Sequence, residues 1–93
     1  MPTRPKSLSV EELLLLSEAR QLAASGRGRQ IRESAGVSQS ELAAAIGVTI
    51  AGISKWESGQ RRPTGPGAIR YAQLLRELTK HLADRKGVNG KRK

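Results

Sequence analysis

Cysteine and phenylalanine are missing from this 93-residue chain, and its aromatic residues are one tryptophan and one tyrosine. Without cysteine there is neither a disulfide framework nor a thiolate metal site. With so few aromatic residues, the apolar content falls to leucine, isoleucine, valine and alanine, which favours packed helices over a β-sandwich. The sequence therefore predicts a single small all-α domain in a reducing cytoplasm.

Long apolar runs and catalytic groupings are also lacking. The densest apolar run, Leu13 to Leu16, is too short for a membrane span or a signal-peptide core, so we expect neither membrane insertion nor export. The single histidine, His81, has no cysteine near it, and no serine or cysteine stands in a nucleophile arrangement. Helix capping and the helix dipole account for the adjacent acids Glu11 and Glu12. We therefore expect no enzyme, no metal and no cofactor.

Acidic residues are scarce relative to basic ones. Eight Asp and Glu face seventeen Lys and Arg, which leaves a formal net charge of +9. A charge of this density attracts polyanions, so nucleic acid or an anionic membrane surface must be considered as a partner. Charge alone does not locate a binding face, because most runs of charged residues are simply solvated.

Composition divides the chain into three parts. Residues 1–8 have too little apolar content to pack and are predicted to form a flexible arm. Residues 9–83 carry helical patterns and form the domain. Residues 84–93 contain Val88 as their one strongly apolar side chain and are predicted to be a disordered basic tail. The cations at 91–93 either add nonspecific DNA affinity or keep the chain soluble.

A helix is expected to begin at Val10, because Ser9 and Glu12 have capping-box spacing and Leu8 and Leu13 have hydrophobic-staple spacing. A buried stripe follows at helical spacing. It consists of Leu15, Ala19, Leu22 and Ala23. Leu13, Leu14 and Leu16 lie elsewhere on the helix and need a second cover, either their own domain or a second subunit.

Two glycines interrupt the continuation of this helix. Gly26 and Gly28 either end the helix or only weaken it, since an interior glycine costs about 1 kcal/mol relative to alanine. The helical pattern resumes as far as Ser34, and Gly36 suits the left-handed position after a helix.

Residues 38–59 have the pattern of two short helices joined by a tight turn. Ser38 and Glu41 form a second capping box, Gly47 permits the turn, and Thr49 is a good N-cap for a helix that lasts until Gly59. A small set of apolar residues fixes the angle between the helices. These are Leu42, Ile46, Val48, Ile53 and Trp56, with the small Ala43 where the helices cross. Such a helix-turn-helix projects its second helix into a DNA major groove.

The motif is followed by a link and a last helix. Residues 61–67 contain two prolines and two glycines and are predicted to be a turn-rich basic link that cannot continue a helix. Tyr71 is expected in the core with its hydroxyl reaching water. The last buried stripe consists of Ile69, Ala72, Leu75, Leu78 and Leu82. The whole is predicted to be a compact bundle of about four to five helices.

The chain resembles the lambda-repressor-like helix-turn-helix family, which includes phage Cro and repressor proteins and the xenobiotic-response-element regulators. The resemblance covers about residues 27–82. It is carried by Ser38-Gln39, Leu42-Ala43 with Gly47, Ile53-Ser54-x-Trp56-Glu57-x-Gly59 and Arg61-Arg62-Pro63. It implies a recognition helix over about 50–58, a phosphate contact by Gln39 and a structural ion pair between Arg32 and Glu57. Gly28 departs from the family, in which an apolar residue is common at that position.

The start and outer face of the recognition helix are expected to read bases. The residues there are Thr49, Ile50, Ala51, Ser54 and Lys55. Relatives often have polar amides where this chain has Ile50 and Ala51, so apolar contact with thymine methyl groups is expected from these two. Lys55 would bind guanine or a phosphate.

Four arginines outside the recognition helix are candidates for contacts with the DNA backbone. Arg61 and Arg62 follow that helix and are expected to grip the sugar-phosphate backbone. Arg27 and Arg29 do likewise or are simply solvated.

The function expected from these features is sequence-specific binding of double-stranded DNA by a transcriptional repressor of the phage Cro or immunity type. It would act by operator occupancy, as a homodimer on paired half-sites. One alternative is an antitoxin-type protein, whose leucines cover a toxin partner while the helix-turn-helix represses its own operon. Another is a membrane-surface binder, against which the glycine turn argues.

Overall fold

The computed structural model describes the backbone of residues 8–91 and the side chains of residues 8–85. Within this range the secondary structure is entirely helical, which confirms the predicted all-α class. The helices are α1 (Val10–Ser25), α2 (Arg27–Ser34), α3 (Gln39–Ile46), α4 (Ile50–Ser58) and α5 (Gly65–Lys91).

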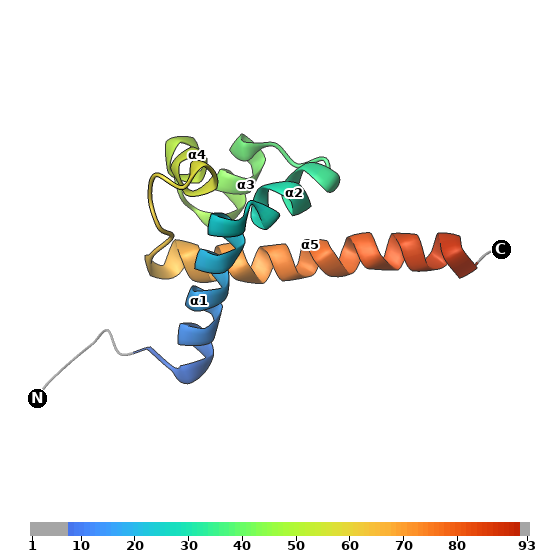
Figure 1. Cartoon of the computed structure of the whole chain (residues 1–93), viewed down its shortest axis with the longest axis horizontal. Coiled ribbons are helices and arrows are strands. Elements are labelled where there is room, and N and C mark those ends of the chain that lie inside the picture. Colours follow the sequence, from blue (N-terminus) through green and yellow to red (C-terminus); the bar gives the residue numbers. More distant parts are fainter. Residues whose placement is uncertain (1–7, 92–93) are drawn as a thin grey trace, which may run out of the picture.

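The long helix α5 is the base on which the other helices pack. Helix α1 crosses α5, and α2, α3 and α4 form a cluster on one side of it (Figure 1). The carboxyl-terminal part of α5 and the amino-terminal part of α1 both project beyond this cluster (Figure 1). The bundle therefore carries two helical extensions.

Three helix starts follow local capping signals. Ser9 and Ser38 each accept a hydrogen bond from the backbone N–H of the glutamate three residues on, and Glu12 and Glu41 accept one in return, so both predicted capping boxes are present. The Thr49 hydroxyl accepts from the Gly52 N–H at 2.9 Å and caps α4. Each box satisfies backbone donors that a helix start leaves without partners.

The core lies where α1, α2, α3 and α4 meet α5. Its buried apolar residues are Leu15, Ala19, Ala23, Ile31, Leu42, Ala43, Ile46, Ile53, Trp56, Ala68, Tyr71, Ala72 and Leu75. The rings of Trp56 and Tyr71 pack at its centre with centroids 5.2 Å apart and tilted by 60°. This aromatic pair joins α4 to α5, with a geometry that aromatic rings favour.

Gly26, not Gly28, ends the first helix. Gly26 has a φ of 81°, a left-handed conformation, and its N–H donates to the Ala23 carbonyl. Gly28 is helical and buried, and a Cβ there would collide with the Tyr71 hydroxyl. Tyr71 is fully buried, so the expectation that its hydroxyl reaches water is wrong. The Tyr71 hydroxyl lies in the space that a side chain at position 28 would occupy.

The last helix is longer at both ends than its sequence predicts. It begins at Gly65, inside the predicted link, because Pro66 fits the first turn of a helix, where its missing N–H is not needed. It continues to Lys91, whereas the composition predicts disorder from Asp84; no proline follows Pro66, and adding residues to an existing helix is easy. The predicted arm at residues 1–8 lies outside the described residues except for Leu8.

The leucines of α1 are only partly covered by their own domain. Leu16 packs against the core, whereas Leu13 and Leu14 are exposed.

Between residues 8 and 91, none of the helices combines the length and hydropathy needed to cross a bilayer.

Candidate nucleic-acid interface

The turn between α3 and α4 is held by its backbone and by close packing. Gly47 has a φ of 75°, and the N–H groups of Gly47 and Val48 donate to the Ala43 carbonyl at 2.9 and 3.0 Å. Beneath the turn, Val48 packs on Gly67 of α5, where an added Cβ would lie 2.6 Å from Val48 Cγ1. A small residue at position 67 therefore lets the turn sit directly on α5.

Helix α4 has one buried face and one exposed face. Ile53 and Trp56 are buried in the core and fix the helix in place. The residues expected to read bases lie on the opposite, exposed face: Thr49, Ile50, Ala51, Ser54 and Lys55. Thr49 also caps the helix, so its side chain has a structural task as well. The start of α4 carries no acidic residue, which leaves its amino-terminal dipole attractive to phosphate.

A buried ion pair ties α4 to α2. Arg32 binds Glu57 through two nearly parallel bonds, with Nε 2.6 Å from Oε2 and Nη2 3.0 Å from Oε1. The two side chains are 8% and 3% exposed. Arg32 also donates to the Val37 carbonyl at 2.8 Å. The ion pair expected from the family resemblance is thus present, and it orients the end of α4.

Gln39 joins this ion pair from the start of α3. Its side-chain nitrogen donates to Glu57 Oε1 at 3.0 Å. Burial raises the pKa of Glu57, but the bonds from Arg32 and Gln39 outweigh that effect and hold the pKa below its usual value. An amide nitrogen has two N–H donors, so this bond uses one and leaves the other for the predicted phosphate contact.

Two arginines that sequence reasoning missed hold the backbone on either side of α4. Arg70 of α5 donates to the Ile46 carbonyl at 2.9 Å, at the end of α3. Arg20 of α1 donates to the Pro63 carbonyl at 2.9 Å, beyond the end of α4. Neither partner is near in sequence, and no local pattern signals such a bond.

The four arginines predicted to contact the DNA backbone lie in different places. Arg61 and Arg62 are exposed, follow Gly59, the C-cap of α4, and line a groove together with Trp56 and with Ala23 and Ala24 of α1. Arg29 is exposed and pairs with Glu33 of its own helix at 3.0 Å. Arg27 lines a groove with α1 and α5 and is not next to α4. Contacts with DNA by all four stay predictions.

Two short helices that cross at a small residue, turn at a left-handed glycine and present an exposed second helix define a helix-turn-helix domain. The chain belongs to the lambda-repressor-like helix-turn-helix family: the model of the family described as Helix-turn-helix matches residues 29–79, more than half of the 93 residues. This is a family of DNA-binding regulators. No curated protein and no solved structure matches the chain.

Proposed function

We propose that the protein is a sequence-specific repressor of the phage Cro or immunity type, which binds an operator through α4 and blocks transcription by occupancy. The observation that supports this proposal is that α4 is held in place with one face exposed. The Arg32–Glu57 pair and the arginine bonds to backbone carbonyls hold this helix in one orientation. A rigidly held helix keeps its side chains in register with base edges.

The chemistry of the α4 face suits a mixed readout. Ile50 is 51% exposed, and its aliphatic side chain together with the Ala51 methyl group suits contact with thymine methyl groups. Lys55 is exposed and can donate to guanine or to a phosphate. Base specificity would then come chiefly from these residues.

The part of the affinity that does not depend on the DNA sequence would come from contacts with the sugar-phosphate backbone of the DNA. Arg61 and Arg62, with Gln39 and the +9 net charge, favour binding to phosphates. This part of the affinity falls as the salt concentration rises. The proposal places the protein with the DNA of the cytoplasm, as a homodimer on paired half-sites.

Selection of bound duplexes from a random pool at physiological salt tests the proposal. We expect enrichment of one paired motif, whereas enrichment of no sequence would contradict it. On the selected site, Lys55→Ala should cost about 1–3 kcal/mol of binding and relax specificity at one position. Arg61→Ala should weaken binding to all sequences about equally. Arg85→Ala, which changes an exposed arginine near the carboxyl-terminal end of α5, should change binding least.

An antitoxin-type protein is the second candidate, because the exposed Leu13 and Leu14 could cover a toxin. Such a protein also binds its own operator, so DNA selection does not separate the two candidates. Co-expression with the product of the adjacent gene does so. Relief of toxicity by this chain, lost in Leu14→Asp, would support the antitoxin function.

A further inference from the structure

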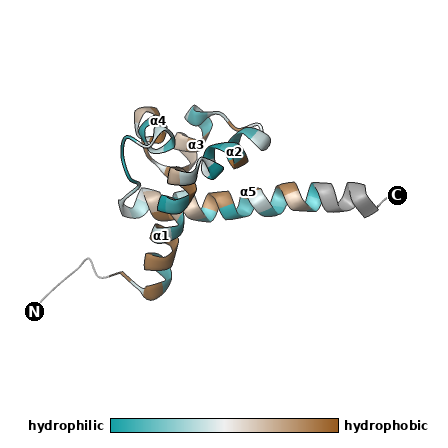
Figure 2. Ribbon diagram, in the orientation of Figure 1, coloured by the Kyte–Doolittle hydropathy of each residue, from teal (hydrophilic) through white to brown (hydrophobic). Residues whose placement is uncertain are grey.

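The amino-terminal half of α1 is apolar on the side facing away from its own core. Val10, Leu13 and Leu14 are 75%, 50% and 62% exposed. In Figure 2 this projecting part of α1 is predominantly hydrophobic. Because α1 is one continuous helix that buries Leu15 and Ala19 against α5, this outer face cannot turn back onto its own domain. Exposed apolar patches of this kind mark interaction sites.

The same part of α1 is acidic. Residues 8–19 contain Glu11, Glu12 and Glu18 and no lysine or arginine, although the whole chain has a net charge of +9. Glu12 caps the helix, and Glu18 is engaged with Arg76 of α5 at 2.7 Å. Glu11 is exposed beside the apolar face. A partner surface for this segment should therefore be apolar with a basic rim.

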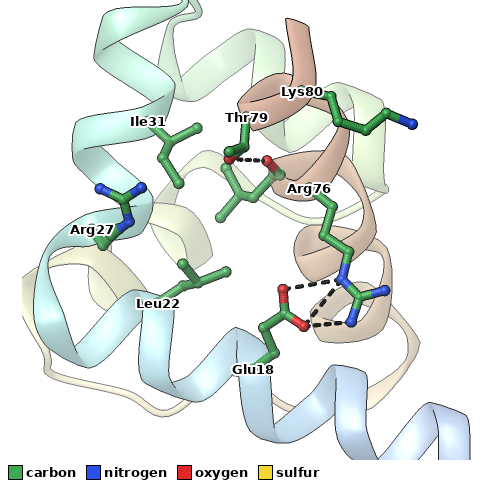
Figure 3. Close-up of a pocket in the computed structure, with 8 residues that line it drawn as sticks. Glu18, Leu22, Arg27, Ile31, Arg76, Thr79 and Lys80 are labelled. Carbon is green, nitrogen blue, oxygen red and sulfur yellow. Dashed lines mark hydrogen bonds and ion pairs between the residues drawn. The ribbon is translucent and has the colours of Figure 1, made fainter. Parts of the chain in front are cut away.

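A groove with these properties lies between α1, α2 and α5, with a volume of about 420 Å³. Its apolar floor is formed by Leu22, Ile31 and Leu75. Three cations and one carboxylate surround the floor: Arg27, Arg76 and Lys80, with Glu18 (Figure 3). Lys80 also lies 3.9 Å from Glu77 of its own helix. The Arg76 guanidinium lies against Glu18 on the α1 wall, whereas the Lys80 ammonium extends away from the groove floor (Figure 3).

We propose that the amino-terminal half of α1 from a second copy of the chain occupies this groove, and that the exchange is reciprocal. This contact would be the dimer interface of the proposed repressor, so the inference rests on that proposed function. A twofold axis lets one pair of contacts cover both apolar faces and both grooves. Since α1 supplies both the inserted face and one wall of the groove, the two α1 helices would lie antiparallel.

Complementarity of charge favours a second copy over an unrelated partner. The inserted segment brings Glu11 and exposed leucines to a groove whose rim carries Arg27 and Lys80. Opposite charges at a rim steer association and fix its register. The groove takes no residue from α3 or α4, so this dimer leaves both recognition helices free to meet DNA.

Sedimentation equilibrium of the full chain tests the apolar contact. The natural protein should show twice the chain mass of 10.0 kDa. Leu14→Asp should raise the dimer dissociation constant by about tenfold or more, because it places a charge in an apolar groove. Ile50→Asp is the matched control, since Ile50 has similar exposure on α4, and it should stay dimeric. A monomeric natural protein, or a Leu14→Asp dimer as tight as the natural one, would overturn the proposal.

A charge exchange tests the pairing itself. Lys80→Glu and Glu11→Lys should each weaken the dimer, because each places like charges at the rim, and the double variant should regain most of the lost affinity. Both residues are exposed, so folding, checked by circular dichroism, should be unchanged. A double variant no more dimeric than the weaker single variant would refute the reciprocal arrangement.

Failure of the interface and failure of the proposed function give different results. If only the interface is wrong, Leu14→Asp and the natural protein will bind the selected paired site with equal affinity and cooperativity. If the interface is right, Leu14→Asp will still recognise a single half-site but lose cooperative binding to the pair. If DNA selection enriches nothing while the dimer forms and responds to Leu14→Asp, the repressor function fails and the interface stands.

Discussion

We predict that Gly28 and Tyr71 are energetically coupled. Gly28→Ala should destabilise the natural protein but stabilise a protein that carries Tyr71→Phe. A Cβ added at Gly28 would collide with the Tyr71 hydroxyl and lie 3.2 Å from its Cζ. In the natural background, Gly28→Ala gains up to about 1 kcal/mol of helix propensity but overpacks the site at a cost of about 1–3 kcal/mol. We therefore expect a net loss of stability of up to about 3 kcal/mol.

Tyr71→Phe removes the atom responsible for the collision. The Tyr71 hydroxyl is fully buried without a hydrogen-bond partner among the described residues, and burial raises the pKa of Tyr71 to about 12. An unsatisfied buried hydroxyl costs about 1–3 kcal/mol, so Tyr71→Phe should be neutral or stabilising despite the small space it leaves. In that background the methyl group introduced at position 28 still lies 3.2 Å from the ring Cζ and 3.3 Å from the Leu22 carbonyl oxygen. Gly28→Ala should then become slightly stabilising, because its gain in helix propensity exceeds the cost of these two tight contacts.

Urea unfolding of the four proteins at one concentration, followed by circular dichroism and Trp56 fluorescence, measures the coupling free energy. We expect about 1–3 kcal/mol in favour of the double variant. Gly52→Ala with Tyr71→Phe is the control pair, because a Cβ at Gly52 would meet only the Thr49 hydroxyl within 4 Å. That pair should be additive. Additivity of the Gly28 and Tyr71 changes within about 0.5 kcal/mol would refute the packing argument.

Three further predictions concern the support of α4. Glu57→Gln leaves the buried Arg32 with the exposed Glu33 carboxylate, 3.8 Å away, as its remaining charge partner and should cost about 3–5 kcal/mol in urea unfolding at neutral pH. The pKa of Glu57 is lower in the folded protein than in the unfolded chain, where it is about 4.3. The contribution of the ion pair to the free energy of unfolding should therefore be fully present above the unfolded pKa and be lost as the pH falls through the folded pKa. The Gln variant should show a shallower acid dependence in the same assay. Gly67→Ala should cost about 1–3 kcal/mol in thermal unfolding, because the β-branched Val48 cannot easily move away. Arg70→Met should cost about 1 kcal/mol of stability in urea unfolding, and no loss would show that its bond to the Ile46 carbonyl contributes nothing.

Features determined by neighbouring residues could be predicted from the sequence. The capping boxes at Ser9 and Ser38, the cap at Thr49 and the left-handed glycines at 47 and 59 each depend on residues within one turn of helix. The core face of α4 also followed from helical spacing, which placed Ile53 and Trp56 inward. The Arg32–Glu57 pair came from family resemblance and not from spacing.

Features that depend on distant partners could not be predicted. Arg20 and its carbonyl acceptor at Pro63 are 43 positions apart, and Arg70 and Ile46 are 24 apart. The helical state of Gly28 and the full burial of Tyr71 are two sides of one contact between α2 and α5. The contact exists only once α2 packs against α5. The sequence around either residue therefore gives no sign that the Tyr71 hydroxyl occupies the space of a side chain at position 28.

The separation between what holds α4 and what α4 presents has an evolutionary consequence. Ile53, Trp56 and Glu57 fix the helix from within, whereas Ile50, Ala51, Ser54 and Lys55 face outward. Under the proposed function, changes at the outward positions would alter the preferred operator at almost no cost in stability, so lineages could diverge in target while keeping one scaffold. Thr49 is the exception, since a new residue there must also cap the helix, which restricts the alternatives to serine, asparagine, aspartate and glycine.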